Sequence, residues 1–191
     1  MKLMAAGDQV LVAEFGDRID EAVNDQVHAL AAKIEEQQIP GIGEVVPTFR
    51  SLLIYYDSYQ LSYREAADKI EELARNLKTE QKTKKRILKI PCCYGARFGP
   101  DLADMEQLTG LDRKEMIDIH SSVDYKVYML GFLPGFAYLG GLDERIHVRR
   151  LKSPRLKISR GAVGIGGSQT GIYPMDSPGG WRLMGETPID M

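Results

Sequence analysis

Glycines and polar side chains crowd one stretch of the sequence, residues 159–182, which reads SRGAVGIGGSQTGIYPMDSPGGWR. So dense a run of glycines would be costly in a helix or a regular strand, because glycine loses more conformational freedom on folding than any other residue. Ser168, Gln169, Thr170 and Tyr173 stand among these glycines. Successive amides in irregular turns form concave surfaces that bind anions. The stretch therefore predicts a contact with a negatively charged ligand.

A basic segment precedes the glycine-rich stretch. It reads HVRRLKSPRLKISR and covers residues 147–160. If RLKIS forms a strand, Arg155, Lys157 and Ser159 share one of its faces, which would suit a carboxylate or a phosphate. A second interpretation stays open at this point, in which the glycines form tight turns and the basic residues form a solvated face.

Three familiar glycine motifs do not fit this stretch. A dinucleotide fingerprint that starts at Gly164 would need its third glycine where Gln169 stands, and no helix is predicted to follow. A phosphate-binding loop would need a lysine where Gly167 stands. A nucleophile elbow around Ser168 would need a glycine where Thr170 stands. All three readings are excluded.

His120 is a candidate general acid or base, because an imidazole titrates near neutral pH. It ends a predicted short helix within the sequence IDIHSS, and a purely structural role is the alternative. The three histidines are widely spaced and form neither an HxH nor an HExxH pair. The only cysteines, Cys92 and Cys93, are adjacent, and two ligands alone do not make a zinc site. We therefore predict no metal site.

Composition narrows the class of protein that must position these residues. The chain has 191 residues, a formal net charge of −2 and 43% hydrophobic residues, which is typical of a soluble globular protein. The near balance of charge argues against a nucleic-acid binder. No apolar run is long enough to cross a membrane, and the N-terminus lacks the pattern of a signal peptide. A cytoplasmic location is predicted.

The first half of the chain has the pattern of a small α+β domain. The segment QVLVAEFGD predicts a strand, and a helix is predicted to follow from Asp20, its N-cap. Two strands around Pro47 and a helix that begins with a Ser62–Glu65 capping box come next. With RILKIPCCY as a last strand, the order is βαββαβ, as in a ferredoxin-like sandwich. The polar run KTEQKTKKR predicts a linker, so the domains are expected at 1–82 and 83–191.

The second half begins with two short predicted helices and continues as strands. GPDLADMEQL carries Pro100 at an expected first helical position, and DRKEMIDIH starts with a capping box at Asp112 and Glu115. From Tyr125 onward, short strand-like pieces are separated by glycine and proline. This pattern predicts a β-barrel or a β-sandwich.

Four segments in order carry a resemblance to a known family. They are VPTFRSLLIYYD, YGARFGPDL, VYMLGFLPGFAYLGGLD and GAVGIGGSQTGIYPMDSPGGWRLMGETP. Together they resemble the family of allophanate hydrolase subunit 1. That family includes the kinase inhibitor KipI, the 5-oxoprolinase subunit PxpB and the first half of the carboxyltransferase domain of urea carboxylase. The similarity runs from about Asp8 to Pro188.

The resemblance implies a small α/β domain followed by a cyclophilin-like β-barrel. Members of the family continue for some tens of residues beyond the position of Pro188, so the last strands of the barrel are expected to be missing here. The resemblance also implies the B-type (PxpB) subunit of an ATP-dependent 5-oxoprolinase, which opens the lactam of 5-oxoproline to glutamate. The expected partners are a subunit resembling allophanate hydrolase subunit 2 (PxpC-like) and a PxpA-like subunit of the LamB/YcsF type, with ATP bound by the assembled complex.

Two alternatives come from the same family. One is a KipI-like inhibitor of a sensor histidine kinase, and the other is a carboxyltransferase subunit of the allophanate hydrolase or urea carboxylase type. For the oxoprolinase, the resemblance implies catalytic roles for His120, Gln169 and Arg182. It implies anion or substrate binding by a wider set: Arg155, Lys157, Gly166, Gly167, Thr170, Gly171 and Tyr173.

Overall fold

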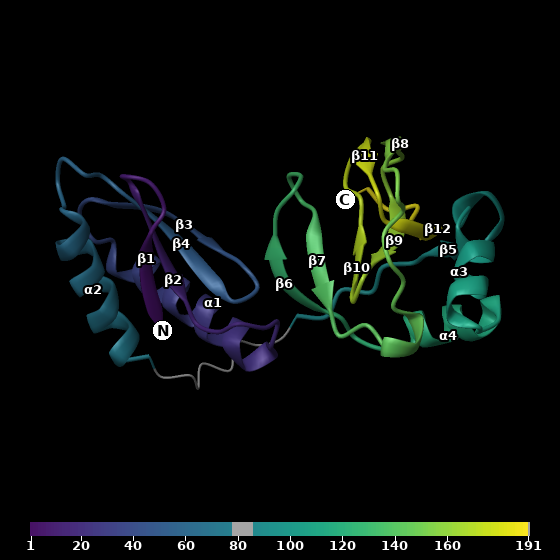
Figure 1. Ribbon diagram of the computed structural model, residues 1–191, viewed down its shortest axis with the longest axis horizontal. Coiled ribbons are helices and arrows are strands. Elements are labelled where there is room, and N and C mark those ends of the chain that lie inside the picture. Colours follow the sequence, from purple (N-terminus) through teal and green to yellow (C-terminus); the bar gives the residue numbers. More distant parts are fainter. Residues whose placement is uncertain (78–85, 191) are drawn as a thin grey trace. The chain divides into compact units, whose positions relative to one another are not determined.

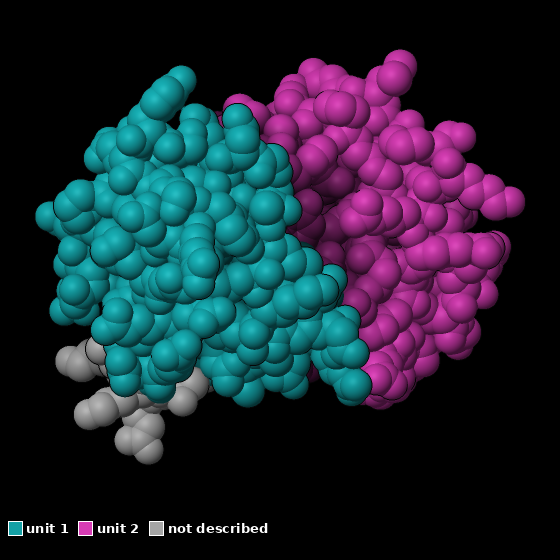
Figure 2. Space-filling model, turned by 60° about the vertical axis from the view of Figure 1, so that its left-hand side comes forward, with its two compact units in different colours: residues 1–85 teal, residues 86–191 magenta. Residues whose placement is uncertain are grey.

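A computed structural model describes residues 1–77 and 86–190 of the chain. The chain divides into two compact units, residues 1–85 and 86–191 (Figures 1 and 2). The boundary expected between residues 82 and 83, and the polar run expected to be a linker, lie almost wholly outside the described residues.

The first unit is a four-stranded antiparallel sheet with two helices (Figure 1). The strand order is β1-β2-β4-β3. The elements are β1 (Lys2–Ala5), β2 (Val10–Glu14), α1 (Glu21–Gln37), β3 (Ile42–Pro47), β4 (Ser51–Tyr56) and α2 (Tyr63–Arg75). Each strand pairs with a neighbour of opposite direction, so the sheet is a complete antiparallel ladder within this unit.

The predicted βαββαβ order is wrong at both ends. The chain starts with a hairpin of β1 and β2, and β1 lies beside β2 at the edge that a final C-terminal strand would take in a ferredoxin-like sheet. The predicted last strand shortens to β5 (Cys93–Tyr94), which pairs with β12 (Arg182–Glu186) in the second unit. An N-terminal strand therefore replaces the expected C-terminal one.

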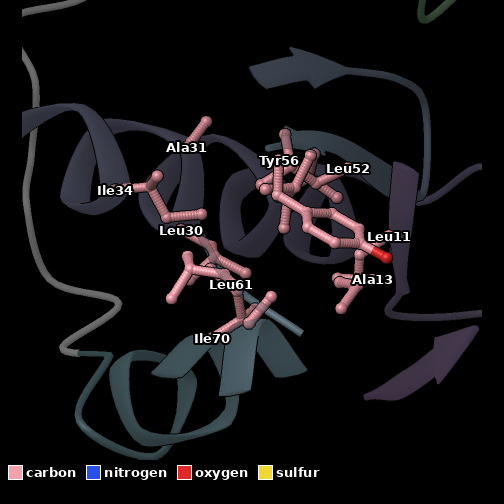
Figure 3. Packing of buried hydrophobic residues seen from close by; sticks show 12 residues of the cluster. Leu11, Ala13, Leu30, Ala31, Ile34, Leu52, Tyr56, Leu61 and Ile70 are labelled. Atoms are coloured by element: carbon pink, nitrogen blue, oxygen red, sulfur yellow. The ribbon is translucent and has the colours of Figure 1, made fainter. Parts of the chain in front are cut away.

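The helix starts of the first unit follow local chemistry. The Asp20 carboxylate accepts the Val23 amide proton at 3.0 Å and caps α1. Ser62 and Glu65 form the predicted reciprocal box at the start of α2. Both helices turn apolar side chains into one core, where Leu30, Leu61 and Ile70 lie together (Figure 3). The predicted N-terminal caps of α1 and α2 are therefore confirmed.

The second unit is built on a six-stranded antiparallel sheet with the order β5-β12-β9-β10-β7-β6. A separate ribbon pairs β8 with β11. The remaining elements are η1 (Ala96–Phe98), α3 (Leu102–Thr109), α4 (Arg113–Ser121), β6 (Lys126–Leu130), β7 (Ala137–Gly140), η2 (Glu144–Ile146), β8 (Arg155–Ile158), β9 (Ala162–Gly166), β10 (Gln169–Ile172) and β11 (Ser177–Gly179).

The expected barrel is not closed by the strand pairing of the described residues. β5 and β6 stand at the two edges of the sheet, and no ladder between described strands joins them. The start of α3 also differs from the prediction, because Asp101 is its N-cap and Pro100 lies outside the helix. The predicted capping box of α4 is present in half, since Asp112 accepts the Glu115 amide proton at 2.8 Å but the described residues show no return bond from the Glu115 side chain.

Two apolar clusters fill the second unit. One brings Leu102 and Met105 of α3 and Met116 of α4 together with Ile165 of β9. The other gathers the aromatic rings of Phe136, Tyr173 and Trp181, with Ile158 and Leu183 beside them. The central strand β9 is buried along its whole length and contributes to both clusters. Among the described residues, no helix has the length and apolar character needed to cross a bilayer.

Candidate functional site

His120 lies at the end of α4, buried against the central sheet of the second unit. Only 6% of its surface is exposed. Its Nε2 atom is 2.8 Å from the hydroxyl of Thr170 on β10, and its Nδ1 atom is 2.8 Å from the hydroxyl of Tyr94 on β5. Tyr125 donates its hydroxyl proton to the His120 carbonyl at 2.6 Å. Both ring nitrogens are therefore occupied inside the protein.

The hydrogen-bond partners define the tautomer of this imidazole. Thr170 donates its hydroxyl proton to the Gly164 carbonyl at 3.1 Å, so its oxygen accepts the Nε2 proton of His120. Nδ1 then carries the lone pair and accepts from Tyr94. Burial lowers the pKa of His120 to about 4, so the ring is neutral at physiological pH. The imidazole that was expected to carry a proton is therefore neutral, and both of its nitrogens are hydrogen-bonded inside the protein.

This buried histidine predicts a pH-dependent stability. Because the folded pKa of about 4 lies below the ordinary value of 6.5, the unfolded state takes up the proton first as pH falls. The stability contribution is complete above pH 6.5 and declines between pH 6.5 and 4. Between pH 7 and pH 5 we expect a loss of about 2 kcal/mol. Urea unfolding of the wild type and of a His120→Gln variant across this range measures it; equal pH slopes for both proteins would contradict it.

Arg182 does not project into an open site. The residue is 9% exposed, its Nε donates to the Arg149 carbonyl at 3.1 Å, and its Nη1 lies 3.0 Å from the Asp104 carboxylate of α3. These contacts join β12, the start of α3 and the basic segment. The guanidinium of Arg182, which was expected to be catalytic, is therefore held by contacts inside the protein.

Gln169 and Arg182 lie on opposite faces of the sheet. Residues directly opposite on paired strands share a face, and Ile165 pairs with both Thr170 and Arg182. That face meets α3 and α4, through the contacts of Arg182 with Asp104 and of Thr170 with His120. Gln169 pairs with Gly166, next to Trp181 on the other face. The structure therefore does not bring Gln169 together with Arg182 or His120.

The glycines expected to bind an anion make room for an indole ring. A Cβ atom on Gly166 would lie 2.5 Å from Nε1 of Trp181, and one on Gly171 would lie 3.1 Å from the same ring. Gly167 differs, since it is exposed at the turn between β9 and β10 with φ +71°. Its amide donates to the Val148 carbonyl at 2.8 Å. Close packing, rather than exposed amides, explains Gly166 and Gly171.

Tyr173 follows β10 at the end of the hairpin away from this turn, and it does not reach the surface. It is 1% exposed and its ring meets Phe136 edge-on, with the centroids 5.3 Å apart. Burial raises the pKa of its phenol, and the backbone amide of Trp181 opposes that shift by donating to it. Tyr173 is therefore part of the aromatic cluster, and its substrate-binding role stays a prediction.

The two basic residues expected on one face of a strand are both paired with aspartates. Arg155 lies 2.5 Å from Asp101, the N-cap of α3, and Lys157 lies 2.8 Å from Asp176. Asp101 also accepts the Leu183 amide proton at 2.7 Å. Arg155 is thereby tied to the start of α3, while Lys157 remains an exposed surface pair.

Sequence reasoning missed Asp101, Asp104 and Tyr94, which hold these groups in place. Asp101 and Asp104 stand three residues apart and so face the same side of one helical turn. That spacing was visible in PDLAD, but their arginine partners are 54 and 78 residues away in the chain. Among the described residues, no cluster of three or more histidine, cysteine, aspartate or glutamate side chains could hold a metal ion.

The whole chain, residues 1–191, matches the family of the carboxyltransferase domain, subdomain C and D. The chain therefore belongs to this family. It is 44% identical to the 5-oxoprolinase subunit designated B in Bacillus subtilis, over 96% of this chain and 80% of that protein. It is 36% identical to the subunit of the same designation in Escherichia coli O157:H7, over 97% of this chain and 84% of that protein. The resemblance proposed from the four motifs is confirmed.

A solved structure supports the same relationship. The crystal structure of the protein TTHA0988 superposes with a TM-score of 0.84 at 32% identity. The match covers 95% of this chain and 36% of that one, so this chain spans about a third of the solved polypeptide.

Proposed function

We propose that this chain is the B-type subunit of an ATP-dependent 5-oxoprolinase and works with other subunits of that enzyme. The supporting observation is its 44% identity to a 5-oxoprolinase subunit of that type, across 96% of this chain and 80% of the relative. The partners would be an allophanate hydrolase subunit 2-like chain and a PxpA-like chain. The assembled enzyme would use ATP to open the lactam of 5-oxoproline to glutamate.

The face of the sheet that carries Gln169 is the side we assign to the substrate. Gln169 is half-buried beside the exposed turn of Gly167 and Ser168, and its side chain makes no hydrogen bond within the described residues. An amide there can donate to a carboxylate or to a developing oxyanion. The opposite face of the sheet is covered by helices. On that side lie His120, Thr170 and Arg182, whose hydrogen bonds connect the helices to the sheet.

Reconstitution tests the function directly. Co-purification with both proposed partners, followed by measurement of ADP formed with and without 5-oxoproline, should show turnover that requires all three chains. Turnover by the two partners alone, equal to that of the three chains, would reject the assignment. Inhibition of a sensor histidine kinase, or capture of a biotinylated carrier protein, without oxoprolinase turnover would instead favour the two family alternatives.

A Gln169→Ala variant tests the side chain within that assay. We expect about a tenfold lower kcat/KM for 5-oxoproline, because one hydrogen bond to a charged group is lost in the transition state. Gln107, an exposed residue of α3, provides the matched control. Gln107→Ala should leave turnover unchanged. Equal rates for the Gln169→Ala variant and the wild type would remove Gln169 from the site.

A further inference from the structure

Residues 145–160, which include the basic segment, contain two kinds of cation. In one group each side chain lies 2.5 to 2.8 Å from an aspartate. These are Arg145, Arg155, Lys157 and Arg160. The other group is Arg149, Arg150 and Lys152, which are exposed and have no carboxylate within ion-pair distance in the described part of the chain. Three neighbouring positive charges are thus left without a counter-charge.

The backbone that carries these unpaired cations is held at three points. The Val148 carbonyl accepts the Gly167 amide proton at 2.8 Å, and the Arg149 carbonyl accepts from Nε of Arg182 at 3.1 Å. The Leu151 amide donates to the Gly180 carbonyl at 2.7 Å. Asp104 holds the far end of the Arg182 guanidinium. Residues 149–152 therefore form an anchored segment, which lowers the entropy lost when a ligand binds.

The surroundings of this segment include an exposed turn and a buried aromatic ring. The guanidinium carbon of Arg150 lies 5.7 Å from the ring centroid of Trp181, whose indole is fixed by the aromatic cluster. Gly167 and Ser168, at the turn paired with Val148, are exposed. Apart from Gly167 and its two chain neighbours, no heavy atom of the described residues lies within 4 Å of the position that a Cβ on Gly167 would take.

We propose that residues 149–152 form a binding site for a phosphate-bearing anion, with the guanidinium groups of Arg149 and Arg150 as its direct ligands. Arginine presents a planar fork of donors that matches phosphate oxygens. Two such forks beside a lysine suit a group with two or more negative charges better than a single carboxylate. Arg182 is the positioning residue, since it holds the Arg149 carbonyl from inside the sheet.

This part of the inference rests on the proposed function, under which the phosphate can come from two sources. One is the polyphosphate tail of ATP, and the other is a substrate that carries a single phosphoryl group. Both present the same oxygen atoms to arginine. Pyrophosphate and inorganic phosphate separate them as probes, because only the first imitates a polyphosphate tail.

Calorimetric titration of the chain by itself tests the site without any turnover. We expect pyrophosphate or inorganic phosphate to bind at low ionic strength. An Arg149→Gln, Arg150→Gln double variant should bind about tenfold more weakly or worse, because charge-assisted hydrogen bonds are lost. Tighter binding of pyrophosphate identifies a polyphosphate ligand, and similar binding of both probes identifies a single phosphoryl group. No binding of either probe to the wild type would overturn the proposal.

The chain offers a control of equal charge. A Lys157→Gln, Arg160→Gln variant also loses two positive charges from exposed positions, but from side chains that are paired with aspartates. Its affinity should stay close to that of the wild type. An equal loss in both double variants would show general attraction to a basic surface and would overturn a specific site. Failure of the oxoprolinase assay leaves this experiment intact, since the probe and the readout are independent of the partners.

The role of Arg182 requires a readout beyond stability. Arg182→Gln should weaken pyrophosphate binding, although the residue touches no ligand in the proposed arrangement. Arg182→Lys should restore part of the affinity, because an ammonium group can still donate to the Arg149 carbonyl. If both variants bind the probe as the wild type does, Arg182 has no positioning role.

Discussion

Replacing Asp101 with alanine is expected to destabilise the second unit by about 3 kcal/mol. The Asp101 carboxylate is buried, with the Leu183 amide at 2.7 Å and Nη2 of Arg155 at 2.5 Å. Its removal leaves a buried N–H group and a half-buried guanidinium without an acceptor. Nη1 of Arg155 is already buried without a hydrogen-bond partner among the described residues. Within them, Asp101 is the carboxylate that pairs with this guanidinium, and no second one replaces it.

Urea unfolding followed by tryptophan fluorescence measures this loss, because Trp181 is the only tryptophan of the chain and is buried in the second unit. Asp118→Ala is the matched control, since Asp118 pairs with Lys114 on the exposed surface of α4. An exposed pair of this kind contributes about 0.5 kcal/mol or less. Similar losses of stability in the two variants would show that the Asp101 contacts contribute no more than an exposed ion pair does.

Replacing Gly166 with alanine is expected to be as damaging, at about 3 kcal/mol. The new methyl group would lie 2.5 Å from Nε1 of the Trp181 indole. The ring has little room to yield, because it is 4% exposed and the rings of Phe136 and Tyr138 meet it at centroid distances of 5.5 and 6.1 Å. The clash must therefore move the strand or the aromatic cluster.

The same fluorescence assay reports on this variant in two ways. The unfolding midpoint should fall, and the emission spectrum of Trp181 should shift as its surroundings change. Gly180→Ala provides the comparison, because the nearest atom to its added Cβ is 3.7 Å away and its backbone is not left-handed. We expect a change below about 1 kcal/mol there. A Gly166→Ala protein as stable as the Gly180→Ala protein would disprove the packing role.

Local signals in the sequence predicted the helices better than the sheets. The caps at Asp20, Ser62 and Asp112 depend on residues three positions apart, and all three are present. β1 was missed because Lys2–Ala5 is too short to show a period. Its place beside β2 depends on pairing with another segment. The partner of β5 is also distant, since Tyr94 pairs with Gly185, and no local pattern reveals such a contact.

The candidate site shows the same division. The sequence singled out His120, but its partner Thr170 lies 50 residues away, and the burial that keeps the ring neutral follows from the packing of α4 on the sheet. Arg182 was expected to offer a catalytic charge. Its side chain turned inward because Asp104 meets it on the helix-covered face. Residue type indicated which positions could carry chemistry. The pairing register of the strands determined on which face of the sheet each of these side chains lies.

The hairpin of β1 and β2 bears on how the protein is made. Since β1 fills the edge beside β2, every described strand and helix of the first unit is encoded before residue 78, and the apolar core there draws on no later residue of the described chain. A ribosome thus releases a segment that has all its folding partners while the remainder is still being polymerised. We expect that nascent segment to reach its native form ahead of, and independently of, everything translated after it.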